Sequence, residues 1–294
     1  MAAIKVLVTG ATGDTGGYAI NELLARGHQV RALAHKPDER SKKLRDRGIE
    51  VVYGDLLDFG QVRAALNGVN RAYFVYPIRP GILQATAYFA QAAKEAGVDG
   101  IVNMSQKSAR EDAKSHAATD HWLSERVFDW SGVPTAHIRP TYFAEWLLYL
   151  APLIRAGRLY VPFGTGKHAP IAAEDQGRVI AGVLDNPAPH AGKVYPLYGP
   201  VEVTYQQTAV VLSRALGKPV EYKQVEFEEF RRNMEAGPRK AAVGNDFLFQ
   251  HLQEVAIDHQ NGIFAGTNDF VEKLGGRPPM TLEAFIEKHR AAFV

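Results

Sequence analysis

Near its N-terminus the chain reads Thr9-Gly10-Ala11-Thr12-Gly13-Asp14-Thr15-Gly16-Gly17, directly after the apolar run 4–8. The run is rich in β-branched residues and is typical of a strand that is buried on both faces. Apolar residues spaced three and four apart follow the glycines, and Gly27 is placed to end the helix that this spacing predicts. Glycines let a backbone turn tightly and approach a pyrophosphate, and a helix N-terminus offers it unpaired N–H groups. The segment therefore predicts a binding site for a phosphate-containing ligand.

The spacing of the glycines, Gly10-x-x-Gly13-x-x-Gly16, differs from the commoner G-x-G-x-x-G pattern of dinucleotide sites. The alternative is a tight turn that binds nothing, but three glycines exceed what a turn alone requires. If a dinucleotide binds here, we expect its phosphates to contact the turn and the first helical residues. The predicted contacts are Gly10, Thr12, Gly13, Asp14, Thr15 and Gly16.

The composition indicates an ordinary enzyme-sized protein of 294 residues, 46% of them hydrophobic, with a formal net charge of +2. A charge this close to neutral argues against bulk electrostatic capture of nucleic acid or a membrane surface. The chain has no cysteine, which excludes disulfides and thiol chemistry, and its ten histidines show no zinc spacing, so we expect no metal site. The longest apolar run, 146–154, is interrupted by Pro152 and is too short to span a bilayer. Since the N-terminus shows no signal-peptide pattern, we expect a cytoplasmic protein.

The second predicted strand, 29–34, bears on the choice between the two nicotinamide cofactors. NAD-selective sites place an acidic residue near the end of this strand, where it binds the ribose 2′-hydroxyl. Ala34 stands there instead, and His35 and Lys36 follow it, which suits a 2′-phosphate. We therefore expect NADP(H) to be preferred over NAD(H), with His35 and Lys36 in contact with it. The basic residues of 42–47 are interpreted as a solvated helix face.

Strand and helix patterns alternate at short intervals up to residue 140. Strands are predicted at 48–54, 72–76, 100–105 and 135–139, and helices at 61–66, 84–96 and 115–130. This alternation predicts an α/β fold with a Rossmann-type, doubly wound parallel sheet. Ligands of such sheets bind outside the carboxyl ends of the strands, so Asp55, Leu56 and Tyr76 are further candidate cofactor contacts. Alternatively, Asp55 or Asp58 caps the helix 61–66.

The second half of the chain has a different texture, with glycines and prolines between shorter helical patterns. We expect 1–150 to form a dinucleotide-binding domain, to which later segments return, and 151–294 to form a smaller, mostly helical substrate-binding domain. Three helices are predicted in it: one at 176–186 capped by Asp175, one that follows the capping box Thr204-x-x-Gln207, and one at 281–292.

Four separate segments of the sequence resemble those of one family. They are the turn 10–16, Gly54-Asp55, the run His121-x-x-Ser124-Glu125 with 131–134 and 138–140 downstream, and 274–279. With these segments the chain resembles the NmrA-like family of atypical short-chain dehydrogenase/reductases, which includes quinone and triphenylmethane reductases. The resemblance implies an NAD(P)H-dependent reductase in which the helix 115–130 presents His121 toward the nicotinamide. Part of the family binds NADP without turnover and acts through protein partners, so a redox-sensing regulator is the alternative.

One feature of the wider superfamily is missing from the sequence. Its catalytic pair is a tyrosine with a lysine four residues later, and none of the 12 tyrosines here has a lysine at that offset. In that pair the lysine lowers the pKa of the phenol so that the tyrosine can protonate a carbonyl group. Without it, a quinone is favoured over a simple ketone, because the phenolate that hydride addition leaves is a far weaker base than an alkoxide. We therefore expect a quinone or other conjugated aromatic small molecule as substrate, bound by a monomer or homodimer.

The candidate catalytic residues are His121, Lys107, Ser105 and Tyr142, and Lys107 is also a candidate cofactor contact. Ser105 and Lys107 follow the strand 100–105, whose carboxyl end borders the nicotinamide in this fold, and either would bond the substrate oxygen as negative charge develops on it. His121 and Glu125 are four residues apart, so we expect Glu125 to raise the pKa of His121 and keep a proton available near pH 7. The alternative is a solvated pair on an exposed helix face.

Overall fold

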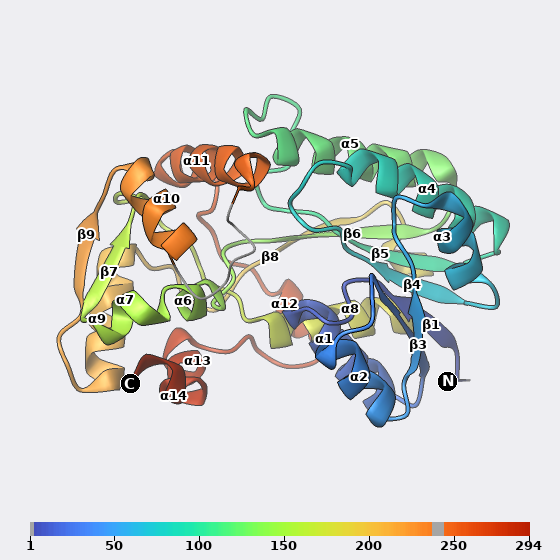
Figure 1. Cartoon of the computed structure of the whole chain (residues 1–294), viewed down its shortest axis with the longest axis horizontal. Helices are drawn as coiled ribbons and strands as arrows, with labels where there is room; N and C mark the ends of the chain where they lie inside the picture. The colour runs from blue at the N-terminus through green and yellow to red at the C-terminus, as the bar shows by residue number, and fades with distance from the viewer. Residues whose placement is uncertain (1–2, 237–243) are drawn as a thin grey trace.

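A seven-stranded sheet lies at the centre of the larger part of the molecule, which a computed structural model describes for residues 3–236 and 244–294 (Figure 1). From edge to edge its strands are β3 (Glu50–Tyr53), β2 (Gln29–Ala34), β1 (Lys5–Val8), β4 (Arg71–Phe74), β5 (Gly100–Met104), β6 (Thr135–Pro140) and β8 (Val194–Leu197). Each strand is parallel to its neighbours. The strand order reverses between β1 and β4, and this confirms the predicted Rossmann-type, doubly wound sheet.

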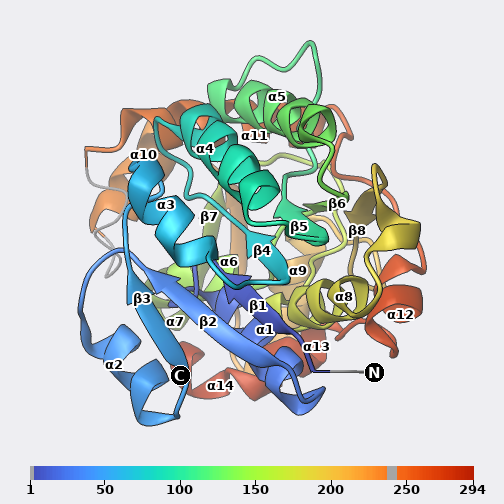
Figure 2. The same ribbon diagram turned by 90° about the vertical axis from the view of Figure 1, so that its right-hand side faces the viewer.

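The strands are apolar on both faces because helices cover both faces (Figure 2). Side chains alternate along a strand, so Leu7 of β1 points to one face and Val6 and Val8 to the other, and all three are fully buried. One face packs against α3 (Phe59–Leu66), α4 (Ile82–Glu95) and α5 (His116–Ser131), and the other against α1 (Asp14–Ala25), α8 (Ala173–Asp185) and α12 (Phe270–Gly275). Helix α2 (Glu39–Asp46) lies beside β3 at the edge.

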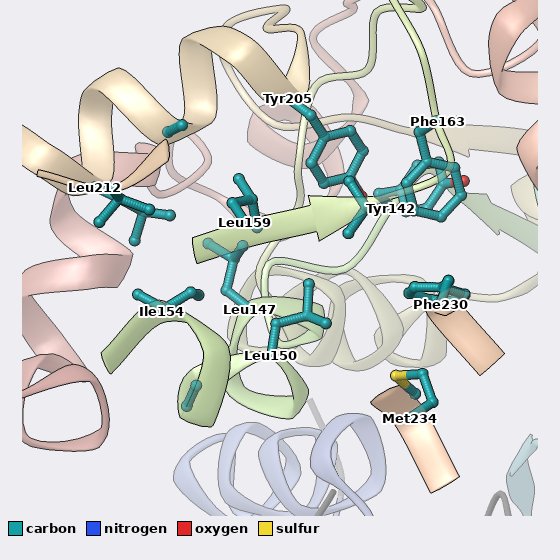
Figure 3. Close-up of a cluster of buried hydrophobic side chains, with 14 of the residues drawn as sticks. Tyr142, Leu147, Leu150, Ile154, Leu159, Phe163, Tyr205, Leu212, Phe230 and Met234 are labelled. Carbon is teal, nitrogen blue, oxygen red and sulfur yellow. The ribbon is translucent and has the colours of Figure 1, made fainter. Parts of the chain in front are cut away.

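The smaller part of the molecule is built on a parallel pair of strands, β7 (Arg158–Val161) and β9 (Glu221–Gln224). Its helices are α6 (Trp146–Tyr149), α7 (Ala151–Arg155), α9 (Tyr205–Leu216), α10 (Phe227–Ala236), α11 (Asp246–Gln260), α13 (Leu282–Lys288) and α14 (Arg290–Phe293). Their apolar side chains share one core cluster, in which Tyr142, Phe163 and Tyr205 pack together (Figure 3). Helix α11 extends from this part to α5, so it spans the two parts (Figure 1).

Segments of the second half return to the large sheet. Helix α8 packs on α1, and β8, which a short 3-10 helix (Ala188–His190) precedes, is the outer strand beside β6. The division of the chain near residue 150 stays a prediction. Among the described residues, no helix is both long and apolar enough to cross a membrane.

The predicted helix boundaries were right in some places and wrong in others. The capping box of Thr204 and Gln207 is confirmed, and Asp58 is the residue that caps α3. Helix α8 begins at Ala173, so Asp175 lies inside its first turn and pairs with the buried guanidinium of Arg178 instead of capping the helix. The predicted helix 281–292 is two helices, because α13 ends before α14 begins at residue 290.

Candidate functional site

The glycine turn leaves the N-terminus of α1 open to a ligand. Gly10 has a φ of +57°, and the N–H of Gly13 donates to the carbonyl oxygen of Gly10 at 2.9 Å. Gly13 is the extended N-cap residue of α1, and no side chain caps the helix there. The N–H groups and the positive dipole end of such a helix attract phosphate. The local geometry therefore fits a pyrophosphate.

Gly13 and Gly16 lack a side chain for different reasons. A Cβ at Gly16 would overlap the carbonyl oxygen of Gly10 and lie 2.8 Å from its carbonyl carbon, whereas a Cβ at Gly13 would meet only that oxygen, at 3.3 Å. We expect Gly16→Ala to lower the free energy of unfolding by about 1–3 kcal/mol, the usual cost of overpacking, and Gly13→Ala to change it by less than about 1 kcal/mol. Urea denaturation of the two variants measures this difference.

The same pair of variants separates folding from ligand approach. The added methyl group of Gly13→Ala stands on the surface that phosphates would approach, so we expect it to weaken dinucleotide binding by about tenfold or more while the fold is kept. Gly13→Ala thus serves as the control for Gly16→Ala. Equal losses of stability in both variants would contradict the assignment of Gly16 to packing and of Gly13 to ligand approach.

A cavity of about 380 Å³ opens beside the first residues of α1, at the carboxyl ends of β4, β5 and β6. Residues of α6 and α11 line its opposite side. Its apolar wall includes Tyr76, Phe143, Trp146, Tyr149, Leu252 and Phe264, and its polar groups include Thr15, Lys107, His121, Glu145 and His251. Ligands of open α/β sheets bind at this place, and an apolar wall with a few polar groups suits an aromatic small molecule.

The cavity gathers about half of the predicted site residues. Asp14, Thr15, Tyr76, Ser105, Lys107, His121 and Tyr142 line it. The other predicted residues, Gly10, Thr12, Gly13, Gly16, His35, Lys36, Asp55 and Leu56, are not part of its wall. The first four belong to the glycine turn, and the last four follow β2 and β3, where the far end of a dinucleotide would lie.

Ser105, at the end of β5, belongs to a buried polar network. Its hydroxyl donates to Oε1 of Glu125 at 2.6 Å, and the guanidinium of Arg139 donates to both oxygens of the same carboxylate, at 2.7 and 2.5 Å. Glu125 is fully buried on the face of α5 that also carries His121, Ser124 and Phe128. The alternative of a solvated pair on an exposed face is therefore wrong. The exposed side of α5 includes Trp130, which is 74% exposed.

The pKa of His121 moves in the opposite direction to the prediction. Burial lowers the pKa to about 4, Glu125 opposes this shift only in part, and the positive charge of Arg139 lowers the pKa further. The carboxylate of Glu125 accepts hydrogen bonds from Ser105 and Arg139, and its effect on the pKa of His121 is smaller than that of burial. At pH 7 the side chain of His121 is therefore neutral. It lines the cavity but does not act as a general acid.

Lys107 brings a positive charge to the cavity. Burial, and after it the charge of Arg139, lowers the pKa of its ammonium group. The Nζ atom lies 5.7 Å from the centre of the Tyr198 ring, and no carboxylate of the described residues acts on its pKa. A cation without a buried counter-ion attracts negative charge that develops nearby. Ser105 is less suited to that task, because its hydroxyl hydrogen is directed to Glu125.

Tyr142, just after β6, is held in an aromatic cluster. Its ring packs against Phe163 and Phe264, at centroid distances of 5.1 and 4.7 Å, and against the buried pair His168 and His259. Burial raises its pKa well above the usual range of a phenol, and its hydroxyl is buried without a hydrogen-bond partner. Tyr142 is therefore a poor acid that shapes one end of the cavity.

Two polar residues of the cavity were missed by the sequence analysis. His251 of α11 has its Nδ1 at 2.8 Å from the hydroxyl of Ser115, and burial lowers its pKa to about 3. Glu145, just before α6, is 5% exposed, and burial raises its pKa to about 7. Neither belongs to a short motif, and each reaches the cavity from a segment outside the first six strands, so no local signal marks them.

The residues predicted at the far end of the cofactor lie on exposed loops. His35 and Lys36 are exposed directly after β2, and Nδ1 of His35 lies 3.9 Å from Oδ2 of Asp55. Oδ1 of Asp55 accepts the N–H of Leu57 at 2.9 Å, so Asp55 orders its own loop. No group of three or more side chains that bind metals is present in the described part of the chain.

Comparisons with known proteins agree with this geometry. Residues 3–286 match the NmrA-like family. The chain is 31% identical to the NAD(P)H azoreductase of Xenophilus azovorans, over 98% of this chain and 99% of that protein. The structure is similar to that of the NADPH-dependent quinone oxidoreductase of Escherichia coli complexed with NADPH, with 28% identity and a TM-score of 0.83 over 97% of this chain and 99% of that chain. It is also similar to the triphenylmethane reductase of Citrobacter sp., with 25% identity and a TM-score of 0.82 over 98% of this chain and 99% of that chain.

Proposed function

The chain belongs to the NmrA-like family, and from this premise we propose that it is an NAD(P)H-dependent reductase that transfers hydride to a quinone or other conjugated aromatic compound. The observation that carries the proposal is the cavity, which joins the N-terminus of α1 to a wall of aromatic side chains. The similar azoreductase and quinone oxidoreductase support the reaction class.

The residues present fit a nicotinamide dinucleotide. The turn 10–16 and the uncapped first turn of α1 would hold the pyrophosphate, and Thr15 and Asp14 continue from there into the cavity. When bound, the nicotinamide supplies the hydride. The protein holds the substrate between aromatic rings such as Tyr76, Trp146 and Phe264, excludes water from the apolar cavity, and presents Lys107 to the oxygen that gains negative charge.

The preference for NADP(H) is part of the proposal and rests on the exposed loop after β2. We expect Lys36→Ala to weaken NADPH binding by about tenfold, the lower end of the range for a charge-assisted bond, because Lys36 is exposed. NADH, which lacks the 2′-phosphate, is expected to bind equally to both proteins. Calorimetry measures both affinities, with Lys43→Ala of α2 as the matched control for the loss of an exposed lysine. Equal losses for NADPH and NADH would contradict this role of Lys36.

The experiment that tests the function is NADPH oxidation, followed at its absorbance, with a panel of quinones, azo dyes and triphenylmethane dyes. Turnover of at least one class supports the reductase and identifies its substrate. Tight NADP binding without turnover of any compound would overturn the reductase and favour a redox-sensing regulator.

A further inference from the structure

Glu145 is a buried acid on the cavity wall that the proposed reaction does not yet use. It follows β6 by a few residues and precedes α6, and its side chain lines the cavity together with Asp14 and Thr15 of α1. Its carboxyl group accepts the N–H of Ala173, at 2.9 Å from Oε1 and 3.1 Å from Oε2, and the backbone N–H of Glu145 itself. Both donors are neutral backbone groups, and they do not offset the cost of burying the negative charge, because the pKa of Glu145 is still raised.

The charged groups around Glu145 do not neutralise it. Its charge interacts with Asp14 and Tyr18 of α1 and with Asp175 of α8, and the two acids disfavour a further negative charge. Asp175 is itself paired with Arg178, and the nearby Glu174 is paired with Lys288 and Arg277. The other titratable groups that line the cavity are Tyr76, Lys107, His121, Tyr142, Tyr149 and His251, and His289 interacts with Asp14. Burial and these two acids together raise the pKa of Glu145 to about 7.

We propose that Glu145 is a proton-binding residue of the dinucleotide site, and that binding of the dinucleotide favours its protonated form. The inference rests on the proposed function, because it requires a dinucleotide whose phosphates lie at the N-terminus of α1. Those phosphates would add negative charge near an acid whose ionised form Asp14 and Asp175 already disfavour. The neutral carboxyl group avoids this repulsion, and one of its oxygens can donate a hydrogen bond while the other accepts the N–H of Ala173.

The direction of the pH dependence follows from proton linkage. The pKa of Glu145 is about 7 in the free protein and becomes higher in the complex, so the complex holds more protons than the free protein between these two values. Binding therefore takes up a proton in that window. The affinity falls by up to about tenfold for each pH unit above 7, and it is independent of pH below 7, where Glu145 is protonated in both states.

The test is calorimetry of NADP⁺ and NADH binding at pH 8, in buffers that differ in ionisation enthalpy. NADH is the decisive probe, because it lacks the 2′-phosphate, which titrates by itself. When either ligand binds, we expect the parent protein to take up most of one proton and Glu145→Gln to take up none. The affinity of Glu145→Gln should not depend on pH, and should exceed that of the parent at pH 9. The control is Glu174→Gln, which removes an acid next to Ala173 in the first turn of α8. The carboxylate of Glu174 pairs with Lys288 and Arg277, so this variant should take up the proton like the parent.

Several outcomes would overturn the inference. Uptake that persists in Glu145→Gln, or that is lost only in Asp14→Asn, would place the proton elsewhere. If Glu145→Gln does not fold, infrared difference spectra of the parent at pH 8 decide, because the C=O band of a protonated carboxyl must appear when NADH binds. Binding without proton uptake overturns this inference alone. If neither dinucleotide binds, the proposed function fails first, and the inference fails with it.

Discussion

Glu125→Ala is expected to lower the free energy of unfolding by about 3 kcal/mol, because it leaves Arg139 and Ser105 without their common acceptor. Breaking a buried ion pair costs about 3–5 kcal/mol, and the lower end applies here because Arg139 keeps 21% of its side chain exposed and can recover some hydration. The side chain of Glu125 is completely buried. Urea denaturation of the variant measures the loss.

The chain offers a matched control for this prediction on an exposed surface. Glu95 pairs with Arg63 at 2.7 Å, a distance as short as those around Glu125, but both side chains are more than a third exposed. Exposed ion pairs contribute about 0–1 kcal/mol, so Glu95→Ala should have little effect. A loss below about 1 kcal/mol in Glu125→Ala, or equal losses in the two variants, would show that burial does not strengthen this network.

The sheet was predictable because its signals are local. The run 4–8, the glycines of the turn and the regular return of strand and helix patterns each depend on residues that are close in sequence. The strand β8 was not predicted, since it is short and contains Pro196, a residue that β-sheets tolerate at their edges. It is defined by its pairing with β6, and this pairing is not a local feature of the sequence.

The faces of α5 show why the polar part of the site was harder to predict. His121, Ser124 and Glu125 are polar, and a polar helix face is ordinarily a solvated one. Here the acceptor groups of Glu125 are filled by Ser105 and Arg139, which lie 20 and 14 residues away in the chain, so the face can be buried. Burial then reverses the expected shift in the pKa of His121. The sequence contains the partners but not their pairing.

Glu145 and His251 illustrate the same limit over longer distances. Glu145 meets the N–H of Ala173 from 28 residues away, and His251 meets Ser115 from 136 residues away. Their titration is set by burial in a cavity that exists only after the two parts of the molecule have packed together. For such residues the sequence shows that the side chain can titrate, but the direction of its pKa shift depends on the fold.

Lys107→Met is expected to lower kcat for a quinone by about 10²–10³-fold, the usual effect of removing one group that stabilises an oxyanion. Hydride addition to a quinone places negative charge on oxygen, and Lys107 is a cavity cation on whose pKa no carboxylate of the described residues acts. Methionine keeps the length and most of the volume of the side chain but removes the charge. Steady-state kinetics with saturating NADPH measure the change, with Lys114→Met, an exposed lysine on the same loop, as the control.

A second substrate distinguishes this role from cofactor binding. A cationic triphenylmethane dye becomes neutral when it accepts hydride, so no oxyanion forms and Lys107 has no developing charge to stabilise. For such a dye we expect Lys107→Met to change kcat by less than about threefold, because no negative charge develops for Lys107 to stabilise. If Lys107 acts instead by holding the cofactor, both substrates lose activity equally and calorimetry shows weaker NADPH binding. Unequal losses with unchanged NADPH affinity therefore assign Lys107 to the substrate oxygen, and equal losses would reassign it to the cofactor.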